Sequence, residues 1–399
     1  MRIKTVPEDF WVEEILKVKP REKGPYALYR LEKRNLTTLE AAGRLSARLG
    51  LPPSALAFPA LKDKRAVAIQ HGTAKTGGKA LPKEIEAPGL KAALLGFLPR
   101  PLSPKDLLGN RFIVTLRDLA AEELPALRER ALLIFRQGFP NYFDLQRFGS
   151  FSPRLGFPGK LLLLGRWEEV LRAYLSEPLL GDPPAVLRFK KFAREHWGDW
   201  KTLKVAAPKG NIRSVLTFLC DHPWDFKRAA NLITPRILSL WLSAYQSFLW
   251  NRVASAVLRE LLPGSAELPH TFGTLTAPCY PMPEGLPEKL QGLEIPLPHA
   301  KALSPAGELL RSAFDQVFSA EGLSPKDLRA RGLRKTFLSR GSRFLWVIPQ
   351  KAEILGDEAD ELFPGQRKLI LTFFLPPGSY ATLLLRLLGR HFGAETSRS

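Results

Sequence analysis

Alternating apolar and polar residues predict strands close to both ends of the chain. The residues at 3–16, 26–31, 66–70 and 109–117 combine this alternation with β-branched and aromatic side chains, which are typical of strands. Residues 368–375 have the same character near the C-terminus. Because a C-terminal strand often pairs with strands at the start of a chain, we expect one sheet built from both ends.

Helical spacing of apolar residues predicts helices between these strands. Thr37 and Glu40 form a capping-box pattern, and Gly50 is a natural stop. The same spacing predicts helices at 124–135, 237–261 and 381–388, and the run Ser324-Pro325-Lys326-Asp327 predicts the start of another. Residues 263–298 are rich in Pro and Gly and predict loops and short strands. The predicted fold class is α+β, with a mixed, mainly antiparallel sheet and a middle segment inserted between its halves.

The charge balance of the sequence predicts a polyanionic partner. The 399 residues include 59 Lys and Arg against 39 Asp and Glu, a formal net charge of +20. Such an excess favours nucleic acid as the partner, with an anionic membrane surface second. A membrane span is disfavoured because the longest apolar runs fall far short of roughly 20 residues. The N-terminus also lacks the apolar core of a signal peptide.

The usage of cysteine and histidine argues against a metal centre. Cys220 and Cys279 stand far apart without a CxxC partner, and the six histidines form no HExxH or HxH pattern. The motifs of P-loops, dinucleotide sites and nucleophile elbows are missing from the sequence. We expect a cytoplasmic monomer that acts on nucleic acid without metal or cofactor. Isomerisation of a base fits this inventory, because a single carboxylate can perform it.

The strongest candidate for chemistry is Asp63, which lies between Lys62, Lys64 and Arg65 at the start of a predicted strand. Nearby cations favour the ionised carboxylate, so Asp63 is suited to act as a nucleophile or a base. The same pattern in isolation is more typical of a solvated charged turn.

A second candidate is the stretch 138–149, where Gly and Pro flank several aromatic residues together with Asn141 and Arg147. Aromatic rings beside amides and arginines suit a flipped base, which needs a face for stacking and partners for hydrogen bonds. The alternative is an aromatic cluster that closes a hydrophobic core.

Five stretches together resemble the TruD family of tRNA pseudouridine synthases, in the family's order and across nearly the whole chain. They are Pro7-Glu8-Asp9-Phe10 with Val12 and Glu14, Leu61-Lys62-Asp63-Lys64-Arg65-Ala66-Val67 with Gln70, Asn141-Tyr142-Phe143 with Gln146-Arg147-Phe148-Gly149, Ser243-Ala244-Tyr245-Gln246-Ser247, and Leu375-Pro376-Pro377-Gly378-Ser379-Tyr380-Ala381-Thr382.

This resemblance implies a pseudouridine-synthase catalytic fold formed from both termini, with an inserted α/β domain specific to the family. It places the catalytic domain at 1–152 and 329–399, and the inserted, RNA-clamping domain at 153–328. The implied reaction converts a D-arm uridine of tRNA, at position 13 in the family, to pseudouridine without a cofactor.

The resemblance also assigns roles to individual residues. Asp63 would be the catalytic aspartate, which attacks the sugar or the ring of a flipped uridine or abstracts a proton. Lys4 would be its basic partner, with Lys62, Lys64 and Arg65 as alternatives.

The remaining assigned residues concern the substrate. Phe143 would stack on the target base, and Asn141 would hold the loop or the base. Arg147 belongs to the same substrate-binding motif, and Phe373 would lie beside the uracil pocket. Gln70 closes the aspartate motif and is more typical of a structural role.

The inserted region is basic and is predicted to clamp the tRNA through Lys190, Lys191, Arg194, Lys201, Lys204 and Lys209. Two positions depart from the family, with Ala68 in place of Thr and Asp144 in place of Gly. Because neither position is Asp63 or Phe143, we expect these departures to affect substrate preference more than activity.

Two other functions compete with this interpretation. A non-catalytic RNA-binding protein built on a decayed synthase would have lost its aspartate, whereas the motif around Asp63 is intact. A nuclease or base-editing hydrolase would need a cluster of metal-binding carboxylates or a Cys/His zinc set, and the sequence shows neither.

Overall fold

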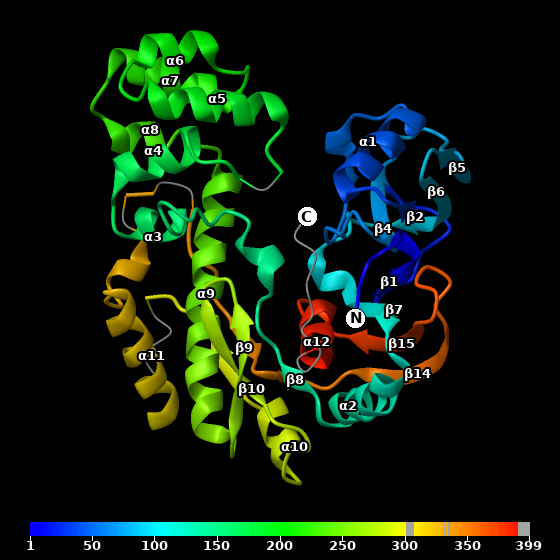
Figure 1. The fold of residues 1–399 in the computed structure, drawn as a ribbon. Helices are drawn as coiled ribbons and strands as arrows, with labels where there is room; N and C mark the ends of the chain where they lie inside the picture. The colour runs from blue at the N-terminus through cyan, green and yellow to red at the C-terminus, as the bar shows by residue number, and fades with distance from the viewer. Residues whose placement is uncertain (180, 301–306, 331, 334–335, 390–399) are drawn as a thin grey trace. The chain divides into compact units, whose positions relative to one another are not determined.

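The computed structural model describes residues 1–389 apart from 180, 301–306, 331 and 334–335. These residues form two compact units, each built from separate segments of the chain (Figure 1). The first unit comprises Met1–Phe139, Tyr280–Pro287 and the chain from Val347 onwards, and the second comprises Pro140–Cys279 and Glu288–Trp346. Two of the passages of the chain between the units fall within short strands, β8 (Phe139–Pro140) and β13 (Trp346–Val347), and the others fall after Cys279 and after Pro287.

A nine-stranded mixed sheet forms the first unit. The strands follow the order β14 (Gln350–Ala359), β15 (Arg367–Leu375), β7 (Leu107–Leu119), β1 (Phe10–Leu16), β4 (Val67–Lys75), β2 (Tyr26–Arg34), β6 (Leu90–Leu98) and β5 (Glu84–Ala87), with β3 (Leu56–Ala57) paired to β4. Among the described strands of this sheet, only β1 and β4 pair in parallel. The expectation of a mainly antiparallel sheet made from both chain ends is therefore confirmed.

Among the described residues, the helices α1 (Thr38–Leu49), α2 (Leu124–Gln137) and α12 (Ala381–Leu388) accompany this sheet. The predicted capping box begins α1, because Thr37 Oγ1 accepts a hydrogen bond from Glu40 N and Glu40 Oε2 accepts one from Thr37 N. The helix ends at Gly50, whose φ of 61° suits a residue without Cβ. Leu45 then packs with Tyr29 and Leu31 in the core.

A buried arginine joins three distant parts of the first unit. Arg117 Nε donates to Asp9 Oδ1 and Nη1 donates to Asp360 Oδ1, both at 2.7 Å. Its Nη2 donates to Glu361 Oε1 at 2.8 Å. Because Asp9 precedes β1 and Asp360 follows β14, this network fixes the N-terminal and C-terminal strands to β7.

The second unit is largely helical. Its helices are α3 (Pro158–Leu163), α4 (Trp167–Leu175), α5 (Pro184–Glu195), α6 (Trp200–Ala206), α7 (Asn211–Asp221), α8 (Phe226–Ala230), α9 (Pro235–Leu261) and α11 (Glu308–Glu321), while α10 (Leu286–Gln291) spans a boundary between segments. Two ribbons complete it, β9 (Ser265–His270) with β10 (Gly273–Pro278) and β11 (Glu294–Pro296) with β12 (Ser342–Phe344). The long helix α9 buries Trp241, Tyr245 and Trp250 completely.

Two expectations differ from the structure. The prediction of a helix from Ser324 is wrong, because the chain there makes only a short 3-10 turn (Asp327–Arg329) and Ala330 leaves it with a φ of 49°. Residues 140–152 and 329–346 group with the second unit, although the sequence placed both in the catalytic domain. The contacts of these two segments explain the grouping. Phe143 forms a hydrogen bond with Asn251 of α9, and β12 pairs with β11.

Candidate active site

Asp63 lies on the loop that leads into β4, and Lys4 reaches it from the N-terminal segment. Lys4 Nζ donates to Asp63 Oδ2 at 2.5 Å, with the two side chains 18% and 31% exposed. The ammonium also lies 4.1 Å from the centre of the Phe10 ring, a cation–π distance. The carboxylate is therefore accessible and forms an ion pair with Lys4, an arrangement that suits a nucleophile or a base.

Two of the neighbouring cations of the motif, Lys62 and Lys64, have other partners. Lys62 Nζ donates to Asn110 and lies 3.2 Å from Glu14 Oε1, whose side chain is fully buried. Glu14 Oε2 accepts a hydrogen bond from His71 N at 2.8 Å. Lys64 Nζ lies 3.7 Å from Glu40. Lys62 and Lys64 are thus paired with glutamates, whereas Lys4 binds the carboxylate of Asp63 directly.

Gln70 supports the aspartate loop through a neighbouring hydroxyl. Its side chain is buried, and its Oε1 accepts a hydrogen bond from Thr38 Oγ1 at 3.0 Å. Thr38 Oγ1 in turn accepts one from Lys62 N at 2.9 Å. Gln70 thus acts on the loop through Thr38, which agrees with a structural role.

Phe373 lies on β15 in the core of the first unit and is 0% exposed. Its ring stacks on Phe112 at 5.3 Å and packs against Phe135 at 6.3 Å. Phe112 meets Phe10 edge-on at 5.8 Å, so an aromatic chain leads from Phe373 to the ring beneath Lys4. Phe373 is thus the most deeply buried member of this series of aromatic rings, and its link to Lys4 runs through Phe112 and Phe10.

The aromatic motif of the second unit is held by α9. Phe143 N donates to Asn251 Oδ1 at 2.8 Å, and Asn251 Nδ2 donates to Phe143 O at 2.7 Å. The half-buried Phe143 ring meets Trp250 edge-on at 5.6 Å, and the Arg343 guanidinium carbon lies 4.2 Å from its centre. Arg147 lies 5.7 Å from the same ring and donates to Ser247 Oγ at 3.1 Å.

Asn141 positions one of these cations. Its Oδ1 accepts from Arg343 Nη2 and its backbone carbonyl accepts from Arg343 Nε, both at 2.7 Å. Its Nδ2 donates to Phe344 O at 3.1 Å. Because the Asn141 side chain is only 6% exposed, it acts on the surroundings of the Phe143 ring through Arg343. Sequence reasoning missed Arg343 and Asn251, although Asn251 follows the Ser243–Ser247 motif by four positions on the same helix.

Asp144, where the family has Gly, does not strain the backbone. Its φ is −94°, which any residue adopts. Among the lysines of the predicted clamp, Lys190 is buried and its Nζ donates to Asp182 Oδ2 at 2.7 Å, so it belongs to the interior. Lys191, Arg194, Lys201 and Lys209 are exposed.

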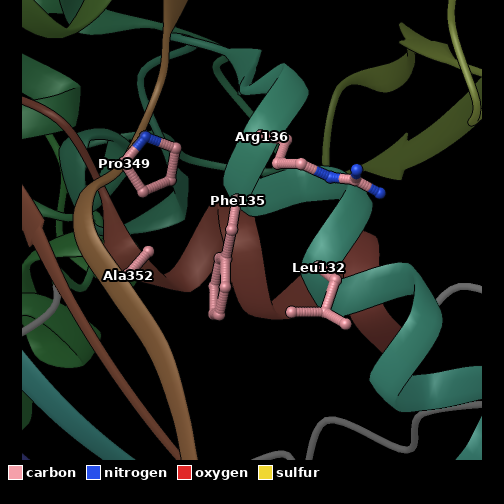
Figure 2. A pocket seen from close by; sticks show the side chains of 5 residues that line it. All are labelled: Leu132, Phe135, Arg136, Pro349 and Ala352. Carbon is pink, nitrogen blue, oxygen red and sulfur yellow. The ribbon is translucent and has the colours of Figure 1, made fainter.

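A cavity of about 450 Å³ opens between α2 and the start of β14 (Figure 2). It is lined by Leu132, Phe135, Arg136, Pro349 and Ala352. This lining holds no acid that could serve as nucleophile or base. The described residues contain no group of three or more His, Cys, Asp or Glu arranged to hold a metal ion. In the same residues, none of the helices combines the length and apolar character of a membrane span.

Comparison with known proteins finds relatives that match almost the whole chain. The family model described as tRNA pseudouridine synthase D (TruD) matches residues 1–270. The tRNA pseudouridine synthase D of Aquifex aeolicus is 32% identical over 97% of this chain and 98% of its own. The probable tRNA pseudouridine synthase D 2 of Methanocaldococcus jannaschii is 30% identical over 97% and 91%. A crystal structure of the putative TruD from Methanosarcina mazei superposes with a TM-score of 0.69 at 25% identity, covering 98% of this chain and 93% of that one.

Proposed function

Because the chain belongs to the TruD family of tRNA pseudouridine synthases, which are isomerases, we propose that Asp63 carries the isomerisation of a D-arm uridine, at position 13 in the family. The observation that supports this role is the contact between Lys4 Nζ and Asp63 Oδ2 at 2.5 Å. An aspartate on an accessible loop, with a lysine ammonium bound to its carboxylate, is placed to act as the nucleophile or the base.

The reaction makes a limited demand on the protein. The bond between N1 of the uracil and C1′ of the ribose breaks, a bond between C5 and C1′ forms, and a proton leaves C5 while N1 gains one. Atoms and electrons balance within the nucleotide and the exchanged proton. One carboxylate can serve as the nucleophile toward the sugar or the ring, or as the base that takes the C5 proton.

The target uridine has to leave its stack before Asp63 can reach it, at a cost of a few kcal/mol. In this proposal Phe143 stacks on the flipped base, since stacking on an aromatic ring compensates for lost base stacking. The guanidinium groups of Arg147 and Arg343 lie close to that ring and would add positive charge beside the stacked nucleotide. Asn141 positions Arg343, and Phe373 supports the aromatic chain below Lys4.

Phosphate contacts from the second unit complete the proposal. The exposed Lys191, Arg194, Lys201 and Lys209, with half-buried Lys204, clamp the tRNA backbone and offset the cost of base flipping. Lys190 is not part of this clamp because its ammonium is committed to Asp182.

The test is pseudouridine formation in unmodified tRNA transcripts that carry a D-arm uridine, with no cofactor or metal added. Wild-type protein is expected to form product and Asp63→Asn, which preserves size but not charge, to form none. Glu86→Gln is the matched control, since this acid is exposed on β5 of the same unit. Product with Asp63→Asn would remove Asp63 from the mechanism, and tight binding of tRNA without product by the wild type would favour a binding protein.

A further inference from the structure

We infer that Lys33 is the positioning residue that fixes the backbone of Asp63 for the reaction. Lys33 Nζ donates to the carbonyl oxygens of Asp63 and Leu36, each at 2.6 Å. This inference rests on the proposed function, in which Asp63 is the reacting group. Lys33 touches the main chain of the aspartate loop, so its action on the substrate is indirect.

The position of Lys33 in the sheet is unusual for a lysine. It lies near the end of β2, two residues after Leu31, on the side of the strand that faces the core. The residue is 0% exposed. Burial lowers the pKa of its ammonium to about 8, although the negative charge of Asp63 opposes this shift. An apolar side chain would fill the same position without this desolvation cost.

The contacts of Lys33 indicate why a lysine occupies this position. Its two hydrogen bonds run to carbonyls from different segments, one between β2 and α1 and one in the aspartate loop. The ammonium therefore ties the loop to the framework of the sheet. The two hydrogen bonds offset part of the desolvation cost of the ammonium, and one of them fixes the main chain of the proposed reacting residue.

Lys33 completes a set of restraints around Asp63. Lys4 holds its carboxylate, Lys33 holds its carbonyl, and Thr38 Oγ1 accepts the hydrogen bond from the preceding amide of Lys62. A carboxylate fixed in this way needs no reorganisation when the uridine arrives. Reacting groups have to be placed to a fraction of an ångström, and a shift of about 1 Å can lower the rate about 100-fold.

The test is single-turnover pseudouridine formation by Lys33→Met, which keeps the length of the side chain and removes both donors. We expect the rate at saturating protein to fall about 100-fold, while the Kd for tRNA stays within about threefold of wild type. The matched control is Lys190→Met, which removes a second buried lysine from α5 in the other unit. It is expected to lower thermal stability and leave the single-turnover rate unchanged.

Lys33→Gln provides a second test if Lys33→Met does not fold, because the amide retains N–H donors near both carbonyls. Its single-turnover rate should be below that of wild type, but by less than the roughly 100-fold loss expected for Lys33→Met, at unchanged Kd and with a circular-dichroism spectrum like that of wild type. A wild-type rate in either folded variant would overturn the role of Lys33, provided that Asp63→Asn is inactive. Activity of Asp63→Asn would instead refute the proposed function, so the two failures are distinguishable.

Discussion

Lys4 Nζ lies 2.5 Å from Asp63 Oδ2, and the backbone that carries Lys4 has a φ of 56°. The left-handed region is unfavourable for a residue with a Cβ by roughly 1–2 kcal/mol. A strained backbone therefore delivers the cation to the carboxylate. The strain and the ion pair are separable by mutation, because one belongs to the main chain and the other to the side chain.

Comparison of Lys4→Ala with Lys4→Gly separates these two contributions. Both variants remove a charge-assisted hydrogen bond of about 1.5–3 kcal/mol, so turnover should fall by roughly tenfold to hundredfold in each. Lys4→Gly should be more stable than Lys4→Ala by about 1 kcal/mol, because glycine adopts a positive φ without penalty. Urea unfolding measures the second difference. Equal stability of the two variants would show that the left-handed backbone carries no cost here.

Replacement of Phe143 tests the proposed stacking of the base. Phe143→Ala should lower turnover strongly, because about 1–3 kcal/mol of stacking is removed, while the affinity for tRNA changes by only about a few fold. Phe143→Tyr retains an aromatic face and serves as the control with near-wild-type turnover. Single-turnover kinetics and filter binding on the same transcript measure the turnover rate and the affinity for tRNA. Unchanged turnover in Phe143→Ala would refute the stacking role.

Salt dependence tests the basic clamp of the second unit. The triple variant Lys191→Gln, Lys201→Gln and Lys209→Gln should bind tRNA more weakly and should show a flatter slope of log affinity against log salt. The slope should decrease by about one for each phosphate that the variant no longer neutralises. A triple variant of the exposed Lys79, Lys83 and Lys91 in the first unit matches the change in net charge. Equal slopes in the two variants would place the phosphate-binding residues elsewhere.

Local signals in the sequence predicted much of the fold. Helix α1 follows its prediction closely because the capping box of Thr37 and Glu40 and the positive φ at Gly50 act within a few residues. The turn at Ser324 carries a similar start signal, and Asp327 does accept from Ser324 N at 2.7 Å. The helix nevertheless fails to continue, because Ala330 adopts a φ of 49°. A cap signal alone cannot decide how far a helix extends.

The candidate site was less predictable because its contacts join distant positions. The motif around Asp63 marked the acid, but the choice among four cations depended on the register that places β1 beside β4. Arg343 lies 202 residues beyond Asn141 in the chain, and nothing in its local sequence marks it. Lys33 and Glu14 are charged residues at strand positions whose side chains face the interior. A charge at such a position is the signal that could have identified them as buried, paired residues.

Removal of the buried arginine should destabilise the first unit strongly. Arg117→Met would leave Asp9 and Asp360 buried without their cation, and breaking such a pair typically costs about 3–5 kcal/mol. The unfolding free energy from urea denaturation measures this change. Arg128→Met is the control, because Arg128 pairs with Asp357 at a partly exposed site and its removal should cost about 1 kcal/mol or less. A comparable destabilisation in both variants would contradict the importance of burial.

The same cluster should make stability depend on acid pH. Hydrogen bonds from Arg117 and Lys368 lower the pKa of Glu361 to about 2. Burial would raise the pKa of Asp360, but hydrogen bonds from the Asp118 and Leu362 amides and from Arg117 outweigh it and lower that pKa as well. Because both folded-state pKa values lie below the unfolded ones, their stabilisation is complete above about pH 4.5 and is lost as pH falls toward about 2. The unfolding free energy of the wild type should therefore decrease more steeply across this window than that of Arg117→Met, which lacks the shared donor. Parallel pH profiles would show that Arg117 does not set the titration of these acids.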